Sequence, residues 1–197
     1  MKRSFAFVVL FLIAGFSFGF QQQGRKAVSL DNEDLSPYLP PPGAKLFEIS
    51  PGEYSPSDSG YAVRLPQTPM VLSRKVPTPI GEMVLQYMTL KTEDMEYNVG
   101  YIDYPPMIDV SNPEGLYGGF REGVLRASQA LLVTDKSIKL KEQTGREIVL
   151  SKDGVRQATH VFLIDHRLYA VTVDYSEKQD KSKEVNQFFN SFRFTSR

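Results

Sequence analysis

The two histidines are the side chains in this sequence that are best suited to chemistry near neutral pH. His160 and His166 lie six residues apart, and an imidazole can serve as a general base, a proton shuttle or a metal ligand. Each of these roles needs partner residues, and the nearest acidic candidates are Asp165 and Asp174. Because no HExxH pattern accompanies the histidines, a small-molecule or metal-binding hydrolase-like enzyme that uses His160 or His166 is the alternative hypothesis.

Three acidic residues lie within or beside the segment 104–112, namely Asp103, Asp109 and Glu114. Oxygen ligands around a flexible loop can hold calcium, but their spacing matches no calcium-binding loop pattern. We interpret them as solvated carboxylates and as an acid at the start of a helix. The leading hypothesis therefore includes no catalytic residue, no metal and no cofactor.

The composition excludes several classes of function. Without any cysteine, the chain forms no disulfide, thiolate site or lipidated cysteine. The sequence also lacks a GxSxG motif, a P-loop and a dinucleotide fingerprint. Its 23 basic residues equal its 23 acidic ones, whereas a nucleic-acid-binding domain needs a basic stripe.

Aromatic and soft apolar residues gather where one predicted strand ends. These candidate partner-binding residues are Tyr101, Tyr104, Pro105, Pro106 and Met107. If they are exposed, they form a recognition patch for another protein. If they are buried, they only close one end of the core, and the sequence leaves both interpretations open.

Residues 1–19 have the pattern of a signal peptide. Lys2 and Arg3 precede an apolar run at 5–16, and Ser17 and Gly19 suit the positions before a signal peptidase cut. We predict cleavage after Gly19 and export to the periplasm or the medium. The alternative is an uncleaved membrane anchor, although the run is shorter than the roughly 20 residues of a spanning helix.

Residues 20–58 have the composition of a proline-rich flexible linker. Prolines, glycines and serines interrupt this range, and no apolar periodicity persists in it. The exception is the short apolar group at Leu46, Phe47 and Ile49, which could add an edge strand. We place the folded domain at 59–195.

Alternating apolar residues predict two groups of four strands in this domain. Asp153-Gly154 and Asp165-His166 predict two-residue hairpin turns, and a third turn is expected at 143–145. Short turns make neighbouring strands antiparallel. The predicted strands cover residues 60–66, 70–76, 82–90, 96–104, 131–140, 145–152, 155–164 and 167–174.

Two amphipathic helices are expected beside these strands. The first begins at the cap Asn112 and Pro113, and its apolar stripe comprises Leu116, Phe120, Val124, Ala127 and Leu131. The second covers 178–190, with Val185, Phe188, Phe189 and Phe192 on one side. We therefore predict an α+β fold in which both helices pack on the apolar side of one antiparallel β-sheet.

Several short motifs resemble those of exported bacterial domains of unknown function with the PsbP-like fold. They are Gly60-Tyr61-Ala62-Val63-Arg64-Leu65-Pro66, Thr78-Pro79-Ile80-Gly81, Tyr97-Asn98-Val99-Gly100-Tyr101-Ile102-Asp103-Tyr104-Pro105, Gly145-Arg146-Glu147, Arg167-Leu168-Tyr169-Ala170-Val171 and Phe188-Phe189-Asn190-Ser191-Phe192. The resemblance covers roughly residues 59–195. It implies an α/β/α sandwich similar to the lumenal extrinsic protein of photosystem II and to a Ran-binding nuclear import factor.

Members of that fold are non-enzymatic binding or assembly factors with unrelated partners. The resemblance thus implies an accessory domain that acts through protein contacts. We predict that this domain is exported, that it is a monomer and that its partner is an unknown envelope protein. Fold likeness alone does not transfer function. A purely structural envelope component is therefore a third hypothesis, beside the histidine-dependent enzyme.

Overall fold

The computed structural model describes residues 51–78 and 81–195. The predicted signal peptide at 1–19 and the strand considered near Leu46 lie outside the described residues. Within the described residues, no helix combines the length and apolar character needed to cross a membrane.

Seven antiparallel strands form the large sheet, in the order β3-β4-β5-β9-β8-β7-β6. It consists of two meanders, β3 to β5 and β6 to β9, which join where β5 pairs with β9. The strands are β3 (Met70–Thr78), β4 (Gly81–Lys91), β5 (Met95–Asp103), β6 (Leu131–Leu140), β7 (Gln143–Lys152), β8 (Val155–Ile164) and β9 (Arg167–Ser176).

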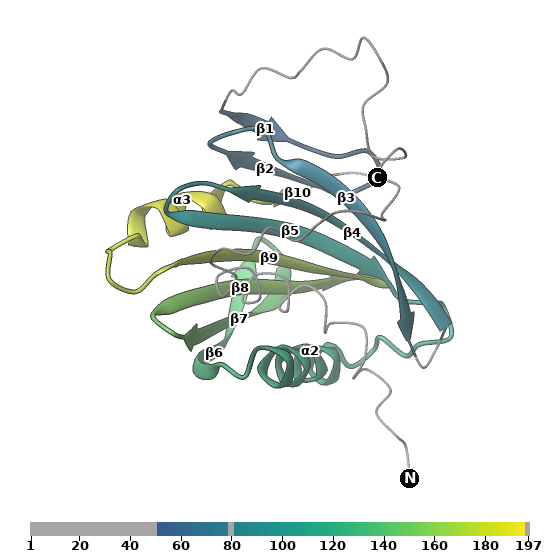
Figure 1. The fold of residues 1–197 in the computed structure, drawn as a ribbon. Coiled ribbons are helices and arrows are strands. Elements are labelled where there is room, and N and C mark those ends of the chain that lie inside the picture. The colour runs from purple at the N-terminus through teal and green to yellow at the C-terminus, as the bar shows by residue number, and fades with distance from the viewer. Residues whose placement is uncertain (1–50, 79–80, 196–197) are drawn as a thin grey trace, which may run out of the picture.

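A second, small sheet has the order β1-β2-β10. Its strands are β1 (Gly52–Tyr54), β2 (Tyr61–Leu65) and β10 (Arg193–Phe194). Strand β1 lies within the range that the sequence assigned to the linker. Strand β10 follows α3 (Ser182–Ser191) directly, and the small sheet lies on the same side of the large sheet as that helix (Figure 1).

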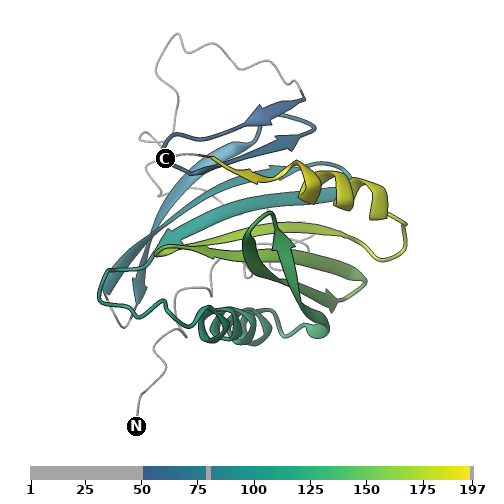
Figure 2. The same ribbon diagram turned by 180° about the vertical axis from the view of Figure 1, so that it is seen from behind.

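The large sheet separates two hydrophobic cores. On one side, α2 (Pro113–Ser128) buries Leu116, Phe120 and Val124 against the sheet. On the other side, α3 and the small sheet bury Phe188, Tyr61 and their neighbours. The view from behind shows the same three layers (Figure 2). We call these faces the α2 side and the α3 side.

The predicted fold class is wrong. Strands account for 55% of the described residues and helices for 18%, so the domain is mostly β rather than α+β. The helices do not share one face, and β2 belongs to a separate sheet. The physical reason is that β2 is buried on both faces at Tyr61, Ala62 and Val63, so it lies above the large sheet instead of extending its edge.

Most of the predicted turns are confirmed. Asp153 and Gly154 adopt φ angles of 51° and 79°, and Asp165 adopts 53°, which matches the left-handed geometry of tight hairpins. The turn expected at 143–145 is wrong, because the chain turns at Lys141, whose φ is 53°. Gly145 lies inside β7, where a Cβ atom would collide with the ring of Phe162.

The predicted start of the first helix is confirmed. The side chain of Asn112 accepts a hydrogen bond of 3.3 Å from the Gly115 amide, and Pro113 occupies the first turn. The predicted apolar stripe of this helix is wrong only at its C-terminal end. The helix stops at Ser128, and Leu131 instead begins β6, where it is 76% exposed.

Candidate functional site

The structure does not bring the five predicted partner-binding residues into one patch. Tyr101 is half-buried on the α3 side, whereas Tyr104 is 4% exposed in the α2-side core. Burial raises the pKa of Tyr104 to about 12. Pro105 is half-buried, and only Pro106 and Met107 are well exposed, Met107 at 80%.

Tyr101 lies beneath a buried arginine that has a structural role. The guanidinium carbon of Arg167 lies 3.8 Å from the centre of the Tyr101 ring. Arg167 donates two hydrogen bonds of 2.5 and 2.6 Å to the Asp103 carboxylate, and others of 2.6 and 3.0 Å to the carbonyls of Asp58 and Ser59. These bonds join β5 and β9 to the segment that leads into the small sheet.

His160 lies on the α3 side of β8, where its ring stacks on Phe189 of α3 with centroids 3.7 Å apart. Its Nε2 atom is 3.9 Å from a carboxylate oxygen of Glu147. Burial lowers the pKa of His160 to about 4, although the charge of Glu147 opposes this shift. The ring is therefore neutral at physiological pH and is a weak base.

A cavity of about 350 Å³ adjoins His160, with Asn186 and Asn190 of α3 among its lining residues. None of the described residues that line it carries a hydroxyl or thiol group that could act as a nucleophile. His166 lies apart in the turn between β8 and β9, where its carbonyl accepts a hydrogen bond from the Tyr104 amide. The two histidines thus occupy different environments.

The α2 side of the large sheet carries a polar region that the sequence analysis missed. At two successive levels of the strand ladder, every residue of the four strands β4, β5, β9 and β8 is polar. The outer level is Lys91, Glu96, Asp174 and Gln157, and the inner level is Thr89, Asn98, Thr172 and Thr159. We call these eight residues the polar floor.

The polar floor adjoins the apolar surface that α2 covers. At the next two levels the same strands present Gly100, Ala170 and Val161, then Ile102 and Leu168, most of which belong to the α2-side core. Buried polar groups are costly unless they find hydrogen-bond partners. Five of the eight floor residues are at most 8% exposed, so the floor is largely a buried polar layer and only its outer end is a candidate binding surface.

Several hydrogen bonds order the floor. The hydroxyls of Thr159 and Thr172 lie 3.1 Å apart, and Asn98 donates a bond of 3.4 Å to Glu96. Burial raises the pKa of Glu96, while the Asn98 bond and the charge of Lys91 oppose that rise. These two interactions thus offset only part of the cost of burying the ionised carboxylate of Glu96.

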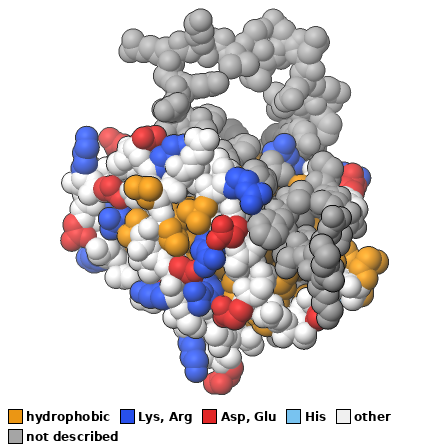
Figure 3. All heavy atoms as spheres, turned by 90° about the horizontal axis from the view of Figure 1, so that it is seen from below, with side chains coloured by type: hydrophobic (Ala, Val, Ile, Leu, Met, Phe, Trp, Pro, Cys, Tyr) orange, Lys and Arg blue, Asp and Glu red, His pale blue; other side chains and the backbone are white. Residues whose placement is uncertain are grey.

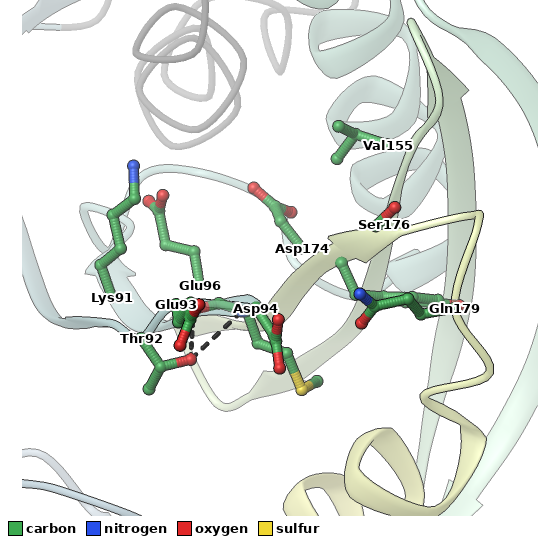
Figure 4. Close-up of a pocket in the computed structure, with 11 residues that line it drawn as sticks. Lys91, Thr92, Glu93, Asp94, Glu96, Val155, Asp174, Ser176 and Gln179 are labelled. Carbon is green, nitrogen blue, oxygen red and sulfur yellow. Dashed lines mark hydrogen bonds between the residues drawn. The ribbon is translucent and has the colours of Figure 1, made fainter.

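A cavity of about 240 Å³ opens at the outer end of the polar floor. Lys91, Glu96 and Asp174 extend into it from three neighbouring strands, and Thr92 to Asp94 of the β4–β5 turn form another wall (Figure 4). Among the described residues, no group of three or more histidines, cysteines or carboxylates is arranged to hold a metal ion. The cavity thus presents charged groups of both signs.

A signal for the polar floor exists in the sequence. Within the predicted strands, Glu96 and Asn98 alternate with tyrosine and valine, and so do Thr172 and Asp174. Such alternation also describes an ordinary solvent-facing side of a sheet. Only the pairing of β5 with β9 brings these residues together.

Comparisons with known proteins establish the fold and no more. No protein-family model matches this chain, and no curated protein matches it either. Among solved structures, it is similar to the solution structure of cyanobacterial PsbP (CyanoP) from Synechocystis sp. PCC 6803, with a TM-score of 0.53 and 18% sequence identity. That match covers 77% of this chain and 96% of the other, and the chain therefore has a PsbP-like fold.

Proposed function

We propose that the mature protein is an exported, non-enzymatic binding or assembly-accessory domain. It acts as a monomer through contacts with another envelope protein. The sequence pattern of residues 1–19 supports export, and the PsbP-like fold is compatible with an accessory role. The observation that carries the proposal is a run of exposed aliphatic residues at the edge of the large sheet.

This run is the start of β6, where Leu131, Leu132 and Val133 are 76%, 44% and 48% exposed. Because β6 is the last strand in the sheet order, no described strand pairs with its outer edge. An extended segment of another protein can add to such an edge through main-chain hydrogen bonds. The three aliphatic side chains would then supply apolar contact.

Features further along β6 limit the contact to this start. The pairing with β7 shifts between Leu132 and Thr134, so Val133 has no partner in the ladder, and such bulges interrupt regular edge pairing. Lys136 and Lys139 follow, and lysines on an edge strand disfavour unspecific pairing. The edge is therefore open to a short segment only.

Other exposed apolar residues are more isolated. Met70 and Val71 begin the opposite edge strand, β3, and Met107 protrudes from the loop before α2. On the α2 side, hydrophobic side chains are interspersed with charged ones of both signs (Figure 3). We retain Pro106 and Met107, from the predicted set of Tyr101, Tyr104, Pro105, Pro106 and Met107, as a second contact.

Site-specific photo-crosslinking in the native cell envelope tests this proposal. A photoreactive amino acid at Leu132 should link the protein to one partner, and the same group at Val71, an exposed aliphatic position on the opposite edge, should not. Leu131→Asp should abolish the link at Leu132 without changing the amount of folded protein. Identical products at both positions, or none, would instead favour a purely structural component.

Export is tested separately by mass spectrometry of the protein isolated from its envelope. The expected N-terminus is Phe20, because the small residues Ser17 and Gly19 suit signal peptidase. An intact N-terminus at Met1 in a membrane fraction would indicate an uncleaved anchor.

A further inference from the structure

The cavity beside His160 has the size and the lining of a small-molecule site. It adjoins the C-terminal part of β6, at Ile138 and Leu140, and not the exposed aliphatic start of that strand. Its volume is about 350 Å³, within the range of roughly 300–1,000 Å³ that is typical of ligand pockets. Most of its lining side chains are apolar, so a ligand with an apolar body suits it.

Three aromatic side chains give the cavity a wall that is ordered before any ligand binds. Phe162, Phe189 and Phe192 all line it, and all three are buried. The rings of Phe162 and Phe192 are nearly parallel, with centroids 6.3 Å apart. Because aromatic rings attract one another beyond the gain from burial alone, this wall favours an aromatic ligand over an aliphatic one.

Glu147 and His160 form a polar end of the same cavity. Both residues line it, and their side chains are 20% and 21% exposed, so a small molecule can reach them. The Oε1 atom of Glu147 lies 3.9 Å from Nε2 of His160, which is too far for a direct hydrogen bond. One ligand oxygen placed about 2.8 Å from each atom would bridge the two groups.

The protonation state of the pair favours a hydroxyl group in this bridging position. Burial lowers the pKa of His160 to about 4, so the imidazole is neutral and has one N–H donor. The carboxylate that faces Nε2 can only accept a hydrogen bond, and it therefore favours the tautomer with the proton on Nε2. A hydroxyl can accept from that N–H and donate to Glu147, whereas an ether or a ketone could only accept.

The charges around this pair favour a neutral ligand. The Glu147 carboxylate is already paired with Lys136 of β6 at 2.5 Å. Lys139 also lines the cavity, but side chains alternate along a strand. Its side chain therefore lies on the opposite face of β6 from Ile138 and Leu140, which pack against the α3-side core. Among the described lining residues, no uncompensated charge points into the cavity.

From these contacts we propose that the cavity binds a neutral hydroxylated aromatic compound of the phenol class. The aromatic ring packs against Phe162, Phe189 and Phe192. The hydroxyl oxygen accepts a hydrogen bond from Nε2–H of His160, and the hydroxyl donates one to Oε1 of Glu147. This ligand site is independent of the partner contact at the start of β6.

The test is an NMR titration of the mature protein with three matched probes. p-Cresol has the ring and the hydroxyl, toluene lacks the hydroxyl, and benzoate carries a negative charge instead. We expect p-cresol to bind most tightly and toluene about tenfold more weakly, because two hydrogen bonds are lost. Benzoate should bind most weakly, because its charge meets the Glu147 carboxylate. Amide shifts should concentrate at residues 138–147, 160–162 and 185–192.

Two variants assign the contacts. Glu147→Gln removes the charged acceptor, and His160→Phe removes the N–H donor while it keeps a ring against Phe189. Each should weaken p-cresol binding by about fivefold and leave toluene binding unchanged, whereas a change in the shape of the cavity would alter the binding of both probes. Glu82→Gln is the control, since this carboxylate also pairs with a lysine of the neighbouring strand, Lys75, but at the opposite edge of the sheet.

The three probes decide the proposal on the unmodified protein, even if a variant fails to fold. No shift with p-cresol would overturn it, as would equal affinities for p-cresol and toluene, which would indicate a purely apolar cavity. Tightest binding of benzoate would also overturn it and would indicate an anion site at Lys139. With folded variants, an affinity for p-cresol that neither substitution changes would contradict the assigned hydrogen bonds.

Discussion

The two faces of the same four central strands differ sharply at the same place. On the α3 side, the levels beside the polar floor are nearly all apolar, whereas on the α2 side two whole levels are polar. The α3-side residues are Leu90, Tyr97, Val173 and Ala158, followed by Met88, Val99, Val171 and His160.

This difference separates a face whose side chains are apolar from a face that carries polar side chains within one sheet. Each strand alternates between faces, so β5 contributes Tyr97 and Val99 to one core and Glu96 and Asn98 to the polar floor. The α3 side buries apolar surface and so stabilises the fold. The α2 side has polar side chains at two levels instead, and five of these eight residues are buried.

The largest predicted effect comes from breaking the apolar side. Phe188 is 3% exposed and packs edge-on against Tyr97, with ring centroids 5.0 Å apart. Phe188→Ala should lower the free energy of unfolding by about 4 kcal/mol, because it leaves a cavity in the core. Chemical denaturation measures the change, and Gln187→Ala, exposed on the same helix, is the control. An equal loss of unfolding free energy in the two variants would contradict the assignment of Phe188 to the core.

A somewhat smaller loss is expected at the junction of the two sheets. Arg167→Ala removes the bonds to Asp103 and to the carbonyls of Asp58 and Ser59. It should lower the free energy of unfolding by about 2 kcal/mol, because the hydrogen bonds of a charged donor are lost and the buried Ser59 carbonyl loses one of its two donors. Hydrogen exchange should also increase in β2. Arg64→Ala, on the exposed face of β2, should change neither the free energy of unfolding nor hydrogen exchange in β2. If Arg167→Ala lowered the free energy of unfolding without increasing exchange in β2, that result would argue against the junction.

His160 should make the α3 side sensitive to acid. Its pKa is 6.5 in the unfolded chain and about 4 in the fold, so below pH 6.5 the unfolded chain binds a proton that the folded protein does not. The free energy of unfolding should therefore fall as the pH falls from 6.5 to about 4, by roughly 2 kcal/mol at about pH 5. Denaturant unfolding at several pH values measures this slope.

The matched variant for this pH effect is His160→Phe, which keeps an aromatic ring against Phe189 and removes the titrating group. Its unfolding free energy should depend less on pH between 6.5 and 4 than that of the wild type. The same slope in both proteins would assign the acid sensitivity to other groups.

The smallest effect is expected on the polar floor. Thr159→Val or Thr172→Val alone should cost about 1 kcal/mol, because each leaves one buried hydroxyl without its partner. The double variant removes both hydroxyls and should cost less than the sum of the single changes. A double-mutant cycle in denaturant measures this coupling, and strict additivity would show that the pair at 3.1 Å is not energetically linked.

Much of the local structure could be predicted because its causes lie within a few residues. Asp153-Gly154 fixes a hairpin by the φ angles that it permits, and Asn112 caps α2 through its own side chain. The turn at Lys141 was missed because a nearby glycine, Gly145, suggested another position. Gly145 in fact serves the close approach of Phe162 on β8, which is a tertiary requirement.

The candidate site was predicted poorly for a related reason. The aromatic residues from Tyr101 to Met107 are adjacent in sequence, but their strand and loop distribute them between two faces and solvent. The polar floor has the opposite character. Its members are separated by up to 85 residues in the chain, from Thr89 to Asp174, and become neighbours only in the sheet.

The sequence by itself determined where most of the strands, the two turns that contain Asp153 and Asp165, and the start of α2 lie, because backbone sterics, capping and side-chain alternation act over short distances. The tertiary structure alone decided that β5 pairs with β9, that β2 leaves the large sheet, and that α2 and α3 cover opposite faces. These choices depend on burying apolar surface from many distant residues at once. The same cooperative pairing placed the polar residues of four strands side by side.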